Sequence, residues 1–281
     1  LADGNPTKGN LIFGSPLSTA IAMRGHVKMC LGMPGWLDDA AASIAMAAPL
    51  DPTSYVFALL WKYVASIPFG ALPADPIAMR ETAEALRIAE GSSDDFVLFM
   101  GLLSRGLVLV TRDRTQREEG LDLFTKTRDA ALAERFSLSA QIIVDPEFAL
   151  EKARTGDLDG AIELVRGVVD GAYDSGDMIW RGRATEVLVQ LLVQRGSVGD
   201  LNEARVAIDQ LATVPTDPGF VLHELPLLRS RALLAHAHGD ENGYRNFLEE
   251  HRARAAAVGF DALITNGDAN LTAAEHDSVS K

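Results

Sequence analysis

The sequence predicts an all-α protein: a solenoid of antiparallel helix pairs, with about six repeats of about 40 residues each. At residues 156–161 a glycine that can close one helix, Gly156, precedes an aspartate that can cap the next, Asp157. An apolar stripe with helical spacing follows, from Leu158 to Ala172. A similar mark returns at 199–200 and 239–240. Looser versions occur near 35, 75 and 113, so the marks lie about 40 residues apart.

Composition limits the function classes. The formal net charge of −13 opposes binding to nucleic acids and to anionic membrane surfaces. Cys30 is the single cysteine, so no internal disulfide forms, and we expect a cytoplasmic location. The longest apolar run, residues 96–110, is interrupted and too short to cross a bilayer. The chain begins with Leu1, and we expect it to be a fragment of a longer protein.

Three segments are expected: a loop at 1–15, a helical-repeat domain at 16–260 and a mostly disordered tail at 261–281. Two expected helix starts have a capping residue followed by a proline at N1: Ser15 with Pro16, and Asp75 with Pro76. Asp51 or Thr53 is expected to cap the helix between them. Helices are expected at 16–33, 36–48, 53 to the loop at 68–73, 76–90, 94–111, 115–136, 137–155, 157–175, 177–195, 200–213, 220–238 and 240–258.

Two prolines leave alternatives open. Either Asp145 caps a short helix that starts at Pro146, or a longer helix is kinked there. Pro226 similarly predicts a helix that starts near His223 or bends at the proline.

The segment 94–111 is apolar on almost every side, which predicts a helix buried between neighbours. Gly101 and Gly106 would let other helices approach it closely. A ligand cavity beside this helix is the functional alternative, and core packing is the preferred interpretation.

The residues that carry chemistry do not assemble into a recognisable catalytic or metal motif. Asp38 and Asp39 suggest the magnesium site of an all-α lyase, but the third carboxylate is missing one turn later, so a solvated first turn is predicted. Cys30 and His26 share a helix face, and we interpret Cys30 as a small buried residue. The arginines at 105, 112, 114 and 117 are predicted to form a solvated helix end. No catalytic residue, cofactor site or metal site is predicted.

The pattern Gly-Asp-Leu-x-x-Ala at 156–161 and 199–204 resembles the turn between the two helices of a tetratricopeptide repeat (TPR), and the long period resembles MalT-type regulators. Blocks at 4–17, 30–36, 84–90, 244–247 and 254–260 resemble the C-terminal helical region of large bacterial proteins in which an adenylate/guanylate cyclase domain precedes an AAA ATPase domain. The resemblance covers residues 4–260 and implies a TPR-like solenoid with a right-handed superhelix. It also implies that cyclase and ATPase activities belong to domains outside this chain.

In such arrays the first helix of each pair lines the concave surface. For the fifth pair this is the helix 177–195, whose core positions are predicted at Ala184, Val187, Leu188, Leu191 and Leu192. A second stripe on that helix is polar and forms the candidate binding groove: Arg183, Glu186, Gln190 and Gln194. An ordinary solvated face is the alternative. Replacing Arg183 and Gln190 with alanine is expected to leave the melting temperature nearly unchanged.

The leading functional hypothesis is a non-enzymatic interaction or sensor module. It would bind a protein or peptide segment, or the cyclase and ATPase domains of the same polypeptide, within a signalling protein. The alternative is a small-molecule effector arm like that of MalT/LuxR-type transcriptional regulators, and an all-α enzyme is disfavoured. Neither nucleic acid nor membrane is an expected partner.

Overall fold

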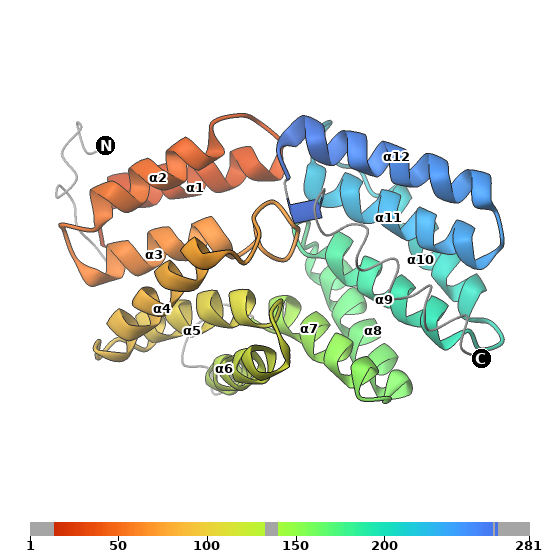
Figure 1. Ribbon diagram of the computed structural model, residues 1–281, viewed down its shortest axis with the longest axis horizontal. Coiled ribbons are helices and arrows are strands. Elements are labelled where there is room, and N and C mark those ends of the chain that lie inside the picture. The colour runs from red at the N-terminus through yellow and green to blue at the C-terminus, as the bar shows by residue number, and fades with distance from the viewer. Residues whose placement is uncertain (1–13, 133–139, 261, 264–281) are drawn as a thin grey trace. The chain divides into compact units, whose positions relative to one another are not determined.

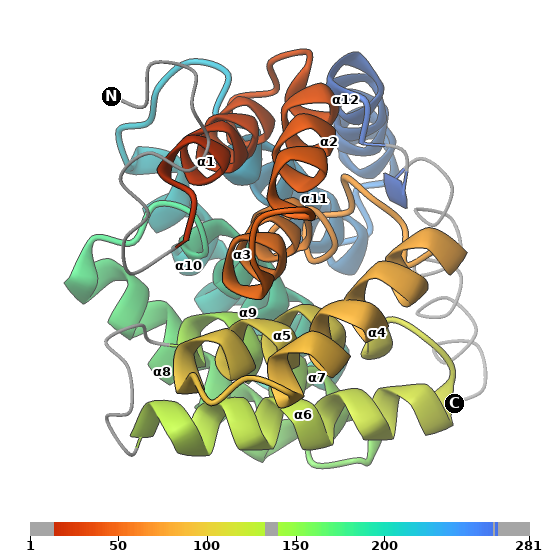
Figure 2. The same ribbon diagram turned by 90° about the vertical axis from the view of Figure 1, so that its left-hand side faces the viewer.

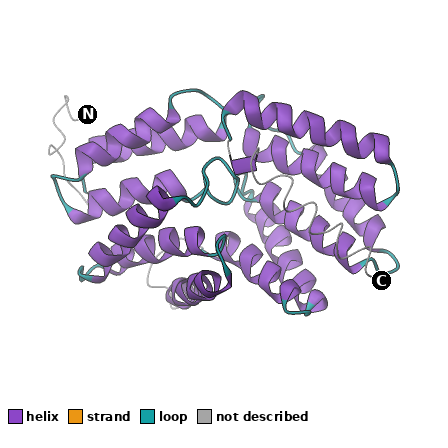
Figure 3. Ribbon diagram, in the orientation of Figure 1, coloured by secondary structure: helices purple, strands orange, loops and turns teal. Residues whose placement is uncertain are grey.

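A computed structural model describes residues 14–132, 140–260 and 262–263, which form twelve helices and no strand (Figures 1 and 3). The all-α prediction is therefore confirmed for the described part of the chain. The helices are α1 Pro16–Cys30, α2 Trp36–Ala47, α3 Pro52–Tyr63, α4 Pro76–Glu90, α5 Asp95–Leu109, α6 Arg114–Leu132, α7 Gln141–Arg154, α8 Leu158–Ser175, α9 Arg181–Arg195, α10 Asp200–Thr213, α11 Val221–Ala237 and α12 Glu241–Val258.

The chain divides into two compact units, residues 1–140 and 141–281, and the boundary between them falls within the span 16–260 that was expected to form one domain. The first unit contains α1–α6 and the second contains α7–α12. The loop expected at 1–15 is described only at Gly14 and Ser15, and the predicted tail lies outside the described residues except for 262–263.

In the first unit α5 packs against α3, α4 and α6 (Figures 1 and 2). Eleven of its residues are buried, which confirms the central helix predicted from its apolar sequence. A Cβ added at Gly101 would lie 2.6 Å from the Cβ of Ala89, and one at Gly106 would lie 2.5 Å from the Phe124 ring. The two glycines therefore permit the close contacts with α4 and α6 that the sequence predicts.

In the second unit α9 is central, because it contacts α7, α8, α10 and α11. The first helices of the three pairs, α7, α9 and α11, lie side by side (Figure 1). Apolar side chains of α8 and α9 form one core with residues of α7 and α10. The predicted core positions of α9 are all buried, as is the α8 stripe apart from the partly buried Leu158.

Most helix starts follow the expected capping chemistry. Gly156 has a φ of +95°, and the Asp157 carboxylate accepts a hydrogen bond from the Gly160 amide at 2.9 Å. Asp75 caps α4, with Pro76 in its first turn. Asp51 caps α3, which decides between the two predicted caps.

The two internal prolines are tolerated within their helices. Pro146 lies inside α7, which starts at Gln141, so Asp145 is not its cap. Pro226 lies inside α11, which starts at Val221, two residues before His223. An internal proline removes one backbone hydrogen bond. Both prolines are buried, and we infer that packing offsets this loss.

Candidate functional site

The candidate groove residues all lie on α9, but they differ in exposure. Glu186 is buried, Arg183 and Gln190 are partly buried and Gln194 is exposed. The stripe therefore changes along the helix, from enclosed near its start to solvent-facing near its end.

Ion pairs connect the enclosed end of the stripe to both neighbouring helices. The Arg183 Nη2 lies 3.0 Å from the Oε1 of Glu147 on α7, and its Nη1 lies 3.6 Å from the Oε1 of Glu186. The same Glu186 oxygen lies 3.0 Å from the Arg229 Nε on α11. We call Glu147, Arg183, Glu186 and Arg229 the polar row. Their side chains are 9–17% exposed.

The charges of the polar row hold α9 to its neighbouring helices as well as forming a polar surface. Burial opposes the charge on Arg183, yet the carboxylates of Glu147 and Glu186 raise its pKa above its usual value. Burial lowers the pKa of His251, on α12, while Glu186 acts in the opposite direction. Removing Arg183 would take one cation away from two enclosed carboxylates, so from the structure we expect the Arg183 part of that variant to lower the melting temperature rather than leave it unchanged.

Sequence reasoning found Arg183 and Glu186 but missed Glu147 and Arg229. Glu147 lies 36 residues before its partner, beyond the reach of helical spacing. One signal was present: Glu186 and Arg229 are separated by about one repeat, so they occupy corresponding positions on successive first helices.

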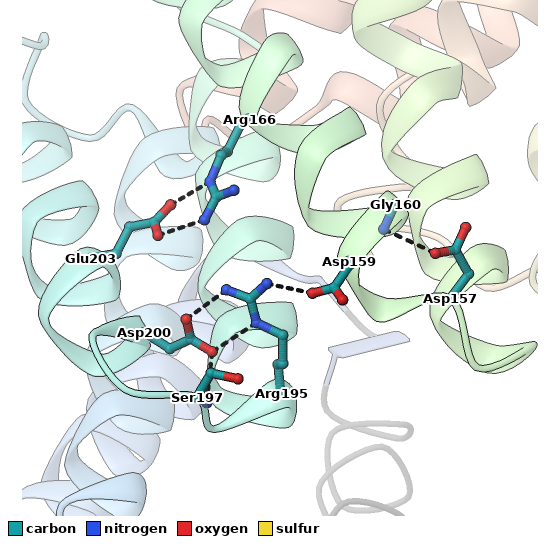
Figure 4. A network of polar contacts seen from close by, with 8 residues as sticks. All are labelled: Asp157, Asp159, Gly160, Arg166, Arg195, Ser197, Asp200 and Glu203. Atoms are coloured by element: carbon teal, nitrogen blue, oxygen red, sulfur yellow. Dashed lines mark hydrogen bonds and ion pairs between the residues drawn. The ribbon is translucent and has the colours of Figure 1, made fainter.

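A second network of polar contacts joins α8, α9 and α10 (Figure 4). Arg195 grips Asp200 through Nε at 2.9 Å and Nη2 at 2.6 Å, and its Nη1 lies 2.6 Å from Asp159. Arg166 grips Glu203 through Nε and Nη2 at 2.6 and 2.7 Å. Hydrogen bonds from Arg195 are the main cause of the lowered pKa of Asp200.

One ion pair of this network has a counterpart at the turn between α7 and α8. Lys152 lies five residues before Asp157, as Arg195 does before Asp200, and its Nζ lies 2.6 Å from the Asp157 carboxylate. Each of these carboxylates is held by a cation of the preceding helix. The arrangement fixes the ends of helices, and we assign it a structural role.

The first acidic pair does not behave as predicted. Asp38 is exposed, but Asp39 is buried, and its oxygens lie 2.6 Å from Arg24 and 2.7 Å from Lys28. Hydrogen bonds from these two cations lower the pKa of Asp39 to about 2. The prediction of a solvated first turn is therefore wrong for Asp39, because α2 approaches α1 closely at Gly25.

The interpretation of Cys30 as a small buried residue is confirmed. Burial raises the pKa of its thiol to about 12 and lowers the pKa of His26 to about 4. The imidazole instead packs edge-on against Trp61, with 4.7 Å between ring centroids. A thiolate–imidazole nucleophile needs the opposite shift of the thiol pKa.

The arginine cluster is only partly a solvated helix end. Arg114 forms an exposed pair with Glu118, as expected. Arg105 is half-buried, and its Nη1 donates a hydrogen bond to the Met79 carbonyl at 2.9 Å. The prediction is wrong for Arg105, because it belongs to the buried α5.

Within residues 14–132, 140–260 and 262–263, no group of three or more His, Cys, Asp or Glu side chains is placed to hold a metal ion. In the same ranges, no helix combines the length and apolar character needed to cross a membrane. Comparison with protein-family models, curated proteins and solved structures found no match to this chain.

Proposed function

We propose that the chain is a helical-repeat interaction module without a catalytic site of its own, and that it binds a protein or peptide segment along α7, α9 and α11. The observation that carries the proposal is the row of first helices in the second unit, with one polar face of α9 running along it. Rows of parallel first helices form the extended binding surfaces of repeat proteins.

A TPR-like solenoid with about six pairs and a right-handed superhelix is part of this proposal. Contacts between helices support repetition in the second unit: α7 lies against α9, α9 lies against α11, and each of these helices contacts its own pair partner. The first unit has the same pattern, because α1 contacts α3 and α3 contacts α5. Left-handed glycines at 156, 199 and 239 precede α8, α10 and α12.

The biological role that we propose follows from the resemblance to cyclase–ATPase proteins. In this role the module is their regulatory C-terminal part, acts in the cytoplasm and passes its binding state to the nucleotide-handling domains. The net charge of −13 supports a protein or peptide partner over a nucleic acid.

The test is a selection of peptides from a displayed random library on the purified chain. The groove variant carries Gln190→Ala and Gln194→Ala, which leave the ion pairs of the polar row intact. Its control carries Glu163→Ala and Asp170→Ala on the exposed side of α8. We expect one enriched peptide family, bound about tenfold more weakly by the groove variant and unchanged by the control.

Two outcomes would oppose the proposal. One is that no peptide family is enriched. The other is that the groove variant and the control bind the enriched family equally well. In either case the exposed face of α9 is an ordinary solvated surface.

The small-molecule effector arm remains a second candidate because one observation favours it. The side chain of Arg181, at the start of α9, is buried, and two of its hydrogen-bond donors have no acceptor among the described residues. Such a group suits a compact anionic ligand.

A further inference from the structure

Arg181, the first residue of α9, is a buried cation, and one edge of its guanidinium group carries hydrogen-bond donors that lack a partner among the described residues. The residue is 5% exposed, and its guanidinium lies over the Tyr173 ring, 5.2 Å from the centroid. Its Nε and Nη2 atoms are enclosed, and neither has a hydrogen-bond partner among the described residues. Buried donors are normally satisfied, so this pair requires an explanation.

The Nε and Nη2 atoms form the edge of a guanidinium that holds a carboxylate in a two-pronged grip. Other arginines of this chain use that edge in this way. In each case Nε and Nη2 donate hydrogen bonds to the two oxygens of one carboxylate: Arg24 to Asp39, Arg87 to Glu84, Arg166 to Glu203 and Arg195 to Asp200. Arg181 presents the same edge in a buried position.

The positive charge of Arg181 lies beside an imidazole and a helix start. Its charge adds to burial in lowering the pKa of His223, in the first turn of α11. The start of α9 has no side-chain cap, and amides at a helix start favour a negative charge. Gly182 brings this start against α11, since a Cβ there would lie 2.7 Å from the Leu222 carbonyl oxygen.

The acids that flank these two helix starts in the sequence are already engaged. Asp177 accepts a hydrogen bond from the Trp180 amide at 2.7 Å. Glu224 accepts hydrogen bonds from the Gly219 amide and from Arg254. The Tyr173 ring supplies a cation–π contact, which lowers the cost of the buried charge without filling its donors.

We propose that the Nε/Nη2 edge of Arg181 binds a carboxylate, which comes either from a small organic acid or from an acidic side chain of a partner. A planar carboxylate matches the fork, fills both donors and neutralises the buried charge. The site is separate from the polar row, so this inference does not depend on the proposed peptide groove.

The experiment uses the full chain and follows its melting temperature and binding heat with sodium acetate, with sodium phosphate, and with sodium chloride at matched ionic strength. Two blocked tripeptides, acetyl-Ala-Glu-Ala-amide and acetyl-Ala-Gln-Ala-amide, separate the two sources of carboxylate. The variants are Arg181→Met, which removes the charge, and Arg181→Lys, which keeps the charge without the fork. Arg205→Met, at an exposed arginine of α10, is the control.

We expect saturable stabilisation by acetate or by the glutamate peptide, and none by chloride or the glutamine peptide. Binding should weaken by about tenfold or more in both Arg181 variants and stay unchanged in Arg205→Met. Binding of acetate alone assigns the site to small acids, and binding of the glutamate peptide alone assigns it to a partner side chain.

Stability without ligand gives an independent readout. In chloride buffer Arg181→Met should melt at or above the temperature of the wild-type protein, because it removes an uncompensated buried charge. A much lower melting temperature would show that Arg181 is a structural tie and would overturn the proposal. Carboxylate binding that survives in Arg181→Met, binding of phosphate alone, or no binding of any probe would also overturn it.

Discussion

Arg183→Ala should destabilise the second unit, although Arg183 lies on a polar stripe. The substitution removes the ion pair of Glu147 with Arg183, and Glu186 keeps its ion pair with Arg229. Breaking one partner out of an enclosed ion pair costs about 3–5 kcal/mol. We take the lower end, about 3 kcal/mol, because Arg183 retains 17% side-chain exposure.

The assay is thermal unfolding followed by circular dichroism at pH 7. For a unit of this size each kcal/mol shifts the melting temperature by about 2–4 °C, so we expect a decrease of about 6–12 °C. Arg205→Ala is the matched control. Its exposed pair with Asp209 is worth about 0.3–0.5 kcal/mol, and its shift should stay below about 2 °C.

A double variant tests the assigned mechanism. Arg183→Ala with Glu147→Ala removes a cation together with one of the carboxylates that pairs with it. The double variant should therefore lose less free energy of unfolding than the two single variants lose in sum. A melting temperature of Arg183→Ala within about 1 °C of the wild-type value would show that these ion pairs do not stabilise the second unit. Strict additivity in the double variant would contradict the direct pairing.

Three further predictions concern the core. Ala161→Asp should be severely destabilising and lower the urea midpoint strongly, because it buries an unpaired carboxylate. Glu163→Ala, on the exposed side, should shift the midpoint little, and similar midpoints for the two variants would contradict the assigned face. Gly106→Ala should lower the free energy of unfolding by about 1–3 kcal/mol through overpacking. Gly167→Ala should raise it by about 0.5–1 kcal/mol, because a Cβ there meets nothing within 4 Å. Urea titration measures both, and equal midpoints would contradict the packing at Gly106. Burial lowers the pKa of His26 to about 4 in the folded protein, below its usual value of 6.5. The unfolded chain therefore binds the proton more readily, and stability falls as the pH drops from 6.5 towards 4. We expect a loss of about 2 kcal/mol between pH 7 and pH 5 that His26→Leu removes, and an unchanged pH profile in that variant would contradict it.

Local features of the fold were predictable from the sequence. The α8 stripe and the caps at Asp75 and Asp157 depend on residues within one or two turns of each other, where spacing and capping chemistry decide the outcome. The burial of α5 was predictable because its own sequence is apolar on every side.

Contacts between distant residues were not predictable in this way. Asp38 and Asp39 are adjacent acids in one first turn, yet only Asp39 faces α1, where Arg24 and Lys28 hold it. The pairing of Arg183 with Glu147 depends on how α7 and α9 pack. Helical periodicity assigns such residues to a polar face, but it does not identify what lies opposite that face.

Photo-crosslinking of the selected peptide shows whether a partner binds along the exposed face of α9. A benzophenone amino acid replaces Gln194 in one protein and Glu163, on the exposed side of α8, in the other. We expect illumination to attach the peptide at position 194 and not at 163, and excess unlabelled peptide to suppress the adduct. Equal attachment at both positions, or attachment at 163 alone, would contradict it.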